Sequence, residues 1–207
     1  MSTWSTPRAR RKVGRPGDDE DVRGAILAAA LRQLEAVGSP DRVTVAAIVE
    51  EAGCTPPSLY HYWPKRELLL QEASARGWAQ FSDTQDDAVA DHHDPVERLR
   101  LRGQAYLNFA LAKPALFRVL FLEAPSVGPT PAHAESGKAL QDLVIDVTEA
   151  MASGLLRPAD ALTTALALWS AMHGVAALWA VTPSLPTDLA YAVGDLAQGA
   201  VLAGLAS

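Results

Sequence analysis

Along most of this 207-residue chain, apolar residues recur at intervals of three or four, the spacing of one face of an α-helix. In the first such stretch they stand at Val22, Ile26, Ala30, Leu34 and Val37. The acidic run at 18–21 is typical of a helix start, where the helix dipole favours negative charge, and Gly38 with Pro40 is typical of a helix end. The pattern predicts a first helix over about 19–37.

Two short helices should follow, separated by a tight turn at Gly53. Thr44 is suited to cap the first of them, and Thr55 is suited to cap the second. The second must end near Tyr62, because the residue before Pro64 is pushed toward an extended conformation. Two short helices joined by a glycine turn predict a helix-turn-helix, whose second helix enters the major groove of DNA.

A long helix from about 64 to 90 should connect this module to the rest of the chain. Further helices are expected at about 95–112, 114–122, 132–153, 158–181 and 186–205. Alternating strand patterns with hairpin signals are missing, so the predicted fold class is all-α, with a three-helix DNA-binding domain before a larger helical bundle. The expected organisation is a flexible basic arm at 1–17, a helix-turn-helix DNA-binding domain at 18–64, and a ligand-binding and dimerisation domain at 65–207.

The net charge of −6 is unevenly distributed. Residues 1–70 hold ten Lys and Arg against nine Asp and Glu, whereas residues 71–207 hold eight against fifteen. Because salt confines the field of each charge to about 8–10 Å, local charge decides attraction to phosphate, and the acidic total does not exclude DNA. The single cysteine, Cys54, suits a reducing compartment, and no signal peptide is evident, so we expect a cytoplasmic protein.

Residues 44–68 resemble the helix-turn-helix of the TetR family of bacterial regulators. The matching positions are Thr44, Val45, Ile48, Glu51, Ala52, Gly53, Thr55, Ser58, Leu59, Tyr60, Tyr62, Trp63, Lys65 and Leu68. Trp63 stands where the family usually has Phe, and Cys54 where it usually has Val. Only Pro64 separates Trp63 from Lys65, where the family usually has two residues, so the turn into the fourth helix is one residue shorter.

A second resemblance lies in the C-terminal half. Trp169, His173 and Gly174 are similar to the Trp-His-Gly (WHG) signature of one group of TetR C-terminal domains, and residues 106–123 resemble the same group. Together the resemblances imply about nine helices, with the last two pairing across a homodimer. They imply a transcriptional regulator, by default a repressor, that binds a near-palindromic double-stranded DNA operator as a dimer and is released by a small-molecule effector.

The resemblance implies that the exposed face of the third helix contacts DNA, with phosphate anchors at the starts of the second and fourth helices. The expected DNA-binding residues are Thr44, Thr55, Pro56, Pro57, Ser58, Tyr60, His61, Tyr62 and Lys65. For His61 the alternative is a solvated surface residue, and for Tyr62 a packing residue. Arg11, Lys12 and Arg15 belong to a basic Gly-Arg-Pro segment that resembles a minor-groove hook, and its alternative is a solubilising tail.

Aromatic side chains concentrate in the C-terminal domain, together with one histidine. The expected ligand-binding residues are Trp78, Tyr106, Phe109, Phe117, Phe121, Trp169, Met172 and His173. The set predicts a pocket for a small apolar or amphipathic effector, and the alternative is an ordinary hydrophobic core.

Other functions find little support. Residues 161–181 carry no Asp, Glu, Lys or Arg and are long enough to span a bilayer, but their alanine content and the absence of flanking Lys and Arg favour a buried helix, so no membrane partner is expected. The phosphate-loop, zinc-protease and nucleophile-elbow motifs are missing, so we expect no enzyme and no cofactor. Adjacent residues such as those at 91–94 rarely converge on a metal, and no metal site is expected. A DNA-binding architectural protein without a ligand remains the alternative.

Overall fold

The computed structural model describes residues 18–123, 131–182 and 184–206, and within these ranges it contains nine α-helices and no strand. The helices are α1 (Asp18–Val37), α2 (Val45–Ala52), α3 (Pro56–Tyr62), α4 (Arg66–Val89), α5 (Pro95–Ala112), α6 (Pro114–Phe117), α7 (Pro131–Ala152), α8 (Ala161–Val181) and α9 (Thr187–Leu205). Two short segments add a 3-10 turn, η1 (Pro40–Arg42), and a π turn, η2 (Arg118–Leu122). The predicted all-α class is confirmed.

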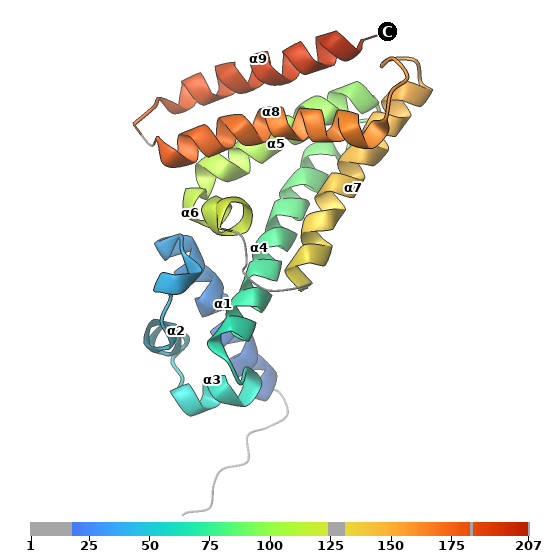
Figure 1. The fold of residues 1–207 in the computed structure, drawn as a ribbon. Helices are drawn as coiled ribbons and strands as arrows, with labels where there is room; N and C mark the ends of the chain where they lie inside the picture. Colours follow the sequence, from blue (N-terminus) through green and yellow to red (C-terminus); the bar gives the residue numbers. More distant parts are fainter. Residues whose placement is uncertain (1–17, 124–130, 183, 207) are drawn as a thin grey trace, which may run out of the picture.

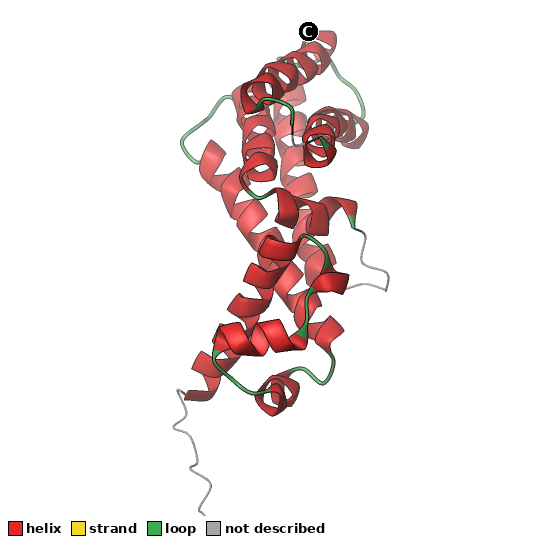
Figure 2. Cartoon of the chain, turned by 90° about the vertical axis from the view of Figure 1, so that its left-hand side faces the viewer, coloured by secondary structure: helices red, strands yellow, loops and turns green. Residues whose placement is uncertain are grey.

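Helices α1, α2 and α3 form a small head at one end of the molecule (Figure 1). Helix α4 begins in the head, where it packs against α1, and continues beside α5 and α7. Helices α8 and α9 lie across the opposite end, with α8 packed on α5, α7 and α9. The perpendicular view shows the same elongated arrangement, with the head at one end and the α8–α9 pair at the other (Figure 2).

The helix ends of the head follow the predicted signals, except that Thr55 stands at the cap position of α3 without a side-chain bond to the helix backbone. The Thr44 side chain accepts a hydrogen bond from the backbone N–H of Ala47 at 3.2 Å and caps α2. Gly53 ends α2 in the left-handed conformation, with φ 66°, which glycine adopts without steric cost. Trp63 is extended at the end of α3, as expected for a residue before proline.

The main hydrophobic core runs from the head into the larger body. Ile26, Leu34 and Leu59 are fully buried in the head, and the same cluster continues through α6 to the body. At the junction, Gly38 has φ +69°, and a β carbon there would lie 3.2 Å from Ala115 Cβ. Glycine is therefore required at this position both by the backbone conformation and by the close approach of α6.

Two element boundaries differ from the predictions. The helix expected at 158–181 begins at Ala161, because Asp160 accepts the backbone N–H of Thr163 at 2.7 Å and caps it there. Pro158 instead lies in a bend, directly after Arg157, whose backbone N donates to Leu205 O at 2.8 Å. The helix expected at 114–122 is α6 followed by the π turn η2, closed by a bond from Glu123 N to Arg118 O at 2.8 Å.

By length and composition, α8 is capable of crossing a membrane, and the bent pair of α5 with the α6–η2 segment passes the same test only as a broken span. In the fold, the side chains of Ala165, Leu168, Met172 and Ala176 on α8 are buried. An apolar helix that is packed on one side against neighbours is typical of a protein core.

Candidate functional site

Helix α3 presents a polar and aromatic face at the tip of the head. Thr55, Pro56, Pro57, Tyr60 and His61 are exposed, and 47% of Tyr60 is open to solvent. The Thr55 and Ser58 hydroxyls lie 3.0 Å apart and hydrogen bond across the first turn of the helix, which orients both. Tyr62 is half-buried and packs on the core, so its ring contributes to the support of the helix.

On its inner side, α3 is held in place by contacts between residues that are far apart in sequence. Leu59 is fully buried, and Trp63 is 4% exposed. The Trp63 indole N–H donates to Glu72 Oε2 at 2.8 Å, and Arg23 binds the same carboxylate at 2.7 and 2.8 Å. The Arg23 guanidinium also lies 4.9 Å from the Trp63 ring centroid, a cation–π contact. This Arg23–Trp63–Glu72 cluster joins α1, the end of α3 and α4.

The short turn before α4 leaves Lys65 exposed directly before the first helical residue. The next residue, Arg66, faces inward, where its Nη1 donates to the carbonyls of Pro40 at 2.9 Å and Val43 at 2.6 Å. Because Val43 precedes the cap of α2, Arg66 ties the start of α4 to the start of α2. Thr44 and Lys65 are therefore exposed at the beginnings of two joined helices. The arm residues Arg11, Lys12 and Arg15 lie outside the described residues.

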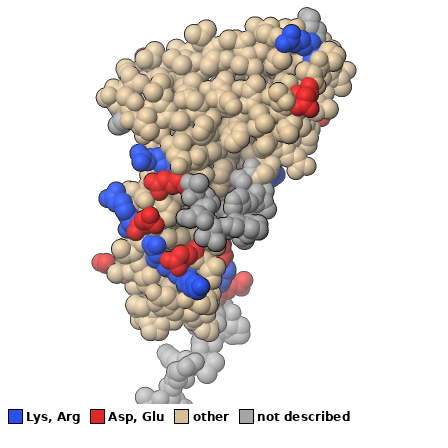
Figure 3. All heavy atoms as spheres, viewed as in Figure 1, with Lys and Arg blue, Asp and Glu red and all other residues tan. Residues whose placement is uncertain are grey.

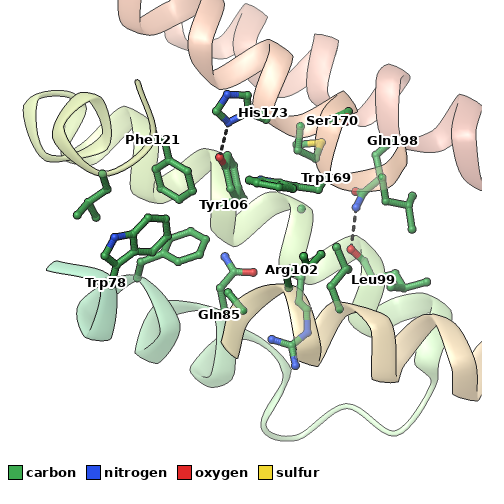
Figure 4. Close-up of a pocket in the computed structure, with 18 of the residues that line it drawn as sticks. Trp78, Gln85, Leu99, Arg102, Tyr106, Phe121, Trp169, Ser170, His173 and Gln198 are labelled. Atoms are coloured by element: carbon green, nitrogen blue, oxygen red, sulfur yellow. Dashed lines mark hydrogen bonds between the residues drawn. The ribbon is translucent and has the colours of Figure 1, made fainter. Parts of the chain in front are cut away.

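A cavity of about 520 Å³ lies in the body among α4, α5, η2, α7, α8 and α9. Its wall is mostly apolar and is formed by Trp78, Phe81, Gln85, Leu99, Arg102, Gly103, Tyr106, Leu120, Phe121, Gly137, Ala139, Leu140, Leu143, Leu168, Trp169, Ser170, Met172, His173 and Gln198. The labelled aromatic side chains converge from four of these elements (Figure 4). Pockets of 300–1,000 Å³ with few polar groups are typical of small-molecule sites.

Six of the eight residues predicted for a pocket form part of this wall. They are Trp78, Tyr106, Phe121, Trp169, Met172 and His173. Phe109 and Phe117 lie behind it: Phe109 packs on Phe81 with ring centroids 5.2 Å apart, and Phe117 stacks on Phe121 at 4.9 Å. Both are buried in the main core, so they support the cavity wall rather than face the cavity.

Tyr106 and His173 form the most direct polar contact in the wall, with 2.7 Å between the hydroxyl oxygen and Nδ1. Burial raises the pKa of Tyr106, although a hydrogen bond from the Trp169 side chain opposes the rise. Burial lowers the pKa of His173. Both shifts favour the neutral forms, so this pair carries no charge at neutral pH.

Two buried glutamines bind the backbone of α5 beside the cavity. Gln198 Nε2 donates to Leu99 O at 2.7 Å. In the amide orientation that satisfies both of its polar atoms, Gln85 donates to Arg102 O at 3.1 Å and accepts from Tyr106 N at 3.0 Å. Gly103 lies between these contacts. In the sequence, the only signal for this arrangement was Gly103 itself, because a glycine inside a predicted helix often marks a place where another element packs closely against the helix.

Among the described residues of the cavity wall, Arg102 is the one that carries a charge, and two carboxylates lie against it. Its Nε donates to Asp146 Oδ2 at 2.6 Å, and its Nη1 lies 3.6 Å from Asp86. Asp146, which is 3% exposed, also accepts a bond from Arg98 Nε at 2.8 Å. Within the described residues, no group of three or more His, Cys, Asp or Glu is arranged to hold a metal ion.

Two family models match the chain. Residues 26–73 match the model of bacterial regulatory proteins of the tetR family, and residues 99–198 match that of a tetracyclin repressor-like C-terminal domain. The two matches together cover more than two thirds of the chain. The chain belongs to the TetR family. Because this is a family of regulatory proteins, the prediction that the chain is not an enzyme is confirmed.

Similar proteins extend this result. The HTH-type transcriptional regulator EthR of Mycolicibacterium smegmatis is 30% identical over 121 residues, which are 56% of this chain and 53% of EthR. The chain thus spans about half the length of the relatives that it matches. A protein of unknown function from Rhodococcus sp. RHA1 has a TM-score of 0.76 at 27% identity, covering 90% of this chain and 96% of that one. AibR, solved with isovaleryl coenzyme A and operator DNA, has a TM-score of 0.63 at 24% identity, covering 87% and 96%.

The two TetR family models cover different parts of the candidate site. The model of the N-terminal domain covers α2, α3 and the start of α4, and the C-terminal model covers the cavity residues from Leu99 to Gln198. Trp78, Phe81 and Gln85 fall between the two matched ranges. The segment of α4 that joins the head to the cavity is therefore one of the parts of this TetR protein that neither model covers.

Proposed function

We propose that the protein is a transcriptional repressor that binds a near-palindromic DNA operator as a homodimer and is released by a small apolar or amphipathic molecule. The observation that carries the proposal is the exposed face of α3, which is held rigidly from behind by Leu59 and the Arg23–Trp63–Glu72 cluster. EthR and AibR support it, because the first is a transcriptional regulator and the second was solved with operator DNA. We also propose a cytoplasmic location.

On DNA, α3 reads the major groove through Thr55, Pro56, Pro57, Ser58, Tyr60 and His61, with Tyr62 supporting from within the helix. Thr44 and Lys65 anchor phosphates, since free N–H groups at helix starts and an exposed ammonium both attract phosphate oxygens. The basic residues Arg11, Lys12 and Arg15 of the arm enter the adjacent minor groove, where narrow A·T-rich sequence strengthens the negative potential.

The homodimer forms through α8 and α9. These helices expose seven large apolar side chains: Leu162, Leu166, Leu178, Val181, Leu189, Tyr191 and Leu196. In the view of Figure 3, the end of the body that carries α8 and α9 shows few Lys, Arg, Asp or Glu side chains, whereas charged side chains gather on the head. Burial of such a face is favourable, and a two-fold axis places two reading heads about 34–36 Å apart on successive major grooves.

The head (18–64) reads DNA, and the body (65–207) binds the effector and dimerises. Lys113, at the junction of α5 and α6, connects the two: its Nζ donates to Glu35 Oε1 on α1 at 3.2 Å and to Gln80 Oε1 on α4 at 2.5 Å. A ligand that contacts Phe121 in η2 would displace η2, and α6 would pass this displacement to the same junction. The ligand shifts the equilibrium between reading geometries by its differential affinity, typically about 1–3 kcal/mol.

The test is an unbiased selection of genomic fragments by the purified full chain at low ionic strength, followed by footprinting of the enriched sites. We expect enrichment of near-palindromic sites and protection of two half-sites about one helical turn apart. Tyr60→Ala should reduce affinity about 5- to 150-fold, corresponding to about 1–3 kcal/mol for a base contact, without altering thermal stability. Arg157→Ala, at an exposed position far from α3, is the matched control. A chain that enriches no fragment refutes the proposal.

A further inference from the structure

Most polar groups of the described cavity wall are already bound, although the buried Nη1 of Arg102 has no hydrogen-bond partner. Tyr106 is hydrogen bonded to His173, Gln198 to Leu99 O, and Gln85 to the backbone of α5. The described wall contains no Asp or Glu, and its only charged residue is Arg102. A molecule that enters this cavity therefore meets aromatic and aliphatic surface with neutral hydrogen-bonding groups.

An anionic ligand would meet one cation in the described wall, and two carboxylates already compensate its charge. Arg102 Nε donates to Asp146, and Arg102 Nη1 lies 3.6 Å from Asp86 without making a hydrogen bond. The surrounding network contains three cations, Arg98, Arg102 and Lys138, against four carboxylates, Asp86, Asp142, Asp146 and Glu149. A carboxylate ligand would thus lose its hydration on entering the cavity, and the charged network beside the wall has one more carboxylate than cations. Both effects make its binding unfavourable.

A cationic ligand would also lack an ionic partner. Asp146, the most buried carboxylate nearby, is not part of the cavity wall and binds two arginines. His173, whose pKa is lowered by burial, accepts or donates as a neutral imidazole and adds no charge of either sign. The aromatic rings of Trp78, Phe81 and Phe121 contact one another edge to face, so their ring faces are partly occupied.

We propose that the cavity selects uncharged, largely apolar ring-containing molecules over their ionised analogues, with one polar group of the ligand beside the Tyr106–His173 pair. This inference rests on the proposed ligand-binding function and specifies its chemistry. The pair is suited to anchor a ligand hydroxyl, because a phenol group can both donate and accept, and the contact with His173 Nδ1 uses only one of these capacities. Burial fixes the position of Tyr106, which is 5% exposed.

The test compares ligands that share one apolar body and differ in charge. Biphenyl, 4-phenylphenol, biphenyl-4-carboxylate and (4-phenylbenzyl)trimethylammonium are titrated into the full chain at pH 7.5 by calorimetry and by quenching of tryptophan fluorescence. The same four head groups on a naphthalene body repeat the comparison. We expect the phenol to bind at least tenfold more tightly than either ion on both bodies. Equal or tighter binding of an ion on either body, or no binding by any compound, overturns the proposal.

The position of the polar group is tested with two matched tyrosine variants. Tyr106→Phe keeps the ring and removes the hydroxyl, so it should weaken 4-phenylphenol about three- to tenfold while leaving biphenyl unchanged. Tyr60→Phe removes a hydroxyl from the exposed face of α3 and should leave both affinities unchanged. Equal loss for both ligands in Tyr106→Phe overturns the anchoring role of the pair.

Failure here is distinguishable from failure of the proposed function. The ligand titrations contain no DNA, and the genomic selection contains no ligand. Tighter binding of a carboxylate would refute the selectivity but leave a ligand-responsive regulator. Loss of all fragment enrichment would refute the regulator but leave the measured ligand preference intact.

Discussion

Gln198 on α9 approaches Gly103 on α5 so closely that a β carbon at Gly103 would lie 2.2 Å from Gln198 Nε2. The amide holds this position because it donates to Leu99 O at 2.7 Å. We expect Gly103→Ala to lower the free energy of unfolding by about 1–3 kcal/mol, the usual cost of overpacking a core, as measured by urea denaturation.

Two further variants test whether the loss of stability in Gly103→Ala comes from the steric clash with Gln198. Gly24→Ala, in α1 where a β carbon meets nothing within 4 Å, should raise stability by about 0.5–1 kcal/mol through its helix propensity. Adding Gln198→Ala to Gly103→Ala should recover part of the loss, since the amide no longer occupies the space. A double variant less stable than the sum of the two singles would contradict the steric explanation.

His173 should make stability depend on pH. Burial lowers its pKa below the ordinary value of 6.5, so the unfolded chain binds a proton at this residue more readily than the folded chain. The contribution of neutral His173 to stability is therefore complete above about pH 6.5 and declines as the pH falls through that value toward the folded-state pKa. The wild type should lose more stability than His173→Gln between pH 7.5 and pH 5.5.

The exposed His92, in the loop before α5, provides the control for this pH dependence. His92→Gln should lose as much stability between pH 7.5 and pH 5.5 as the wild type does. If His173→Gln and His92→Gln showed the same pH profile, burial of His173 would not be the cause.

The Arg23–Trp63–Glu72 cluster should stabilise the reading head. Glu72→Gln leaves one amide oxygen to serve Arg23 and the Trp63 indole, so we expect a loss of about 1–3 kcal/mol in unfolding free energy together with weaker operator binding. Glu67→Gln, on the exposed side of the same helix, should change stability by less than about 0.5 kcal/mol. A double-mutant cycle with Trp63→Phe measures the coupling, and additive effects would show that the indole bond contributes nothing.

Lys113 should transmit ligand binding to the head. Lys113→Met breaks the bonds to Glu35 and Gln80, and we expect the ratio of operator affinities without and with 4-phenylphenol to fall at least fivefold, while ligand affinity stays within twofold. The exposed residue Arg157 at the far end of the body gives the matched control, Arg157→Met. An unchanged ratio in Lys113→Met would exclude this junction as a route of coupling.

Most of the fold was predictable because its signals are local. The caps at Thr44 and Gly53 and the proline at 64 act within a few residues, and the helix ends that they set agree with the structure. The start of α8 was wrong, since Pro158 at a helix start looked as favourable as the true cap, Asp160. In the segment before α8, Leu156 forms an isolated β-bridge with Ala206, a pairing that local sequence does not encode.

The site was predictable in composition but less so in geometry. Helical spacing and family resemblance identified Trp78, Tyr106 and His173, yet they did not show that Phe109 and Phe117 would point into the core. The polar groups that bind α5 belong to Gln85 and Gln198, which are more than a hundred residues apart in sequence, so only the packed structure brings them together.

Helix α4 has a mechanical consequence for a regulator of this shape. From Gln85 at the cavity to Arg66 at the head it is one uninterrupted helix, and nineteen steps of about 1.5 Å make it a rod of roughly 28 Å. A tilt of about 5° at the cavity end therefore moves the far end by roughly 2.5 Å, close to half the pitch of an α-helix. A small tilt of α4 at the cavity wall is thus enlarged along this rod into a larger displacement at the head.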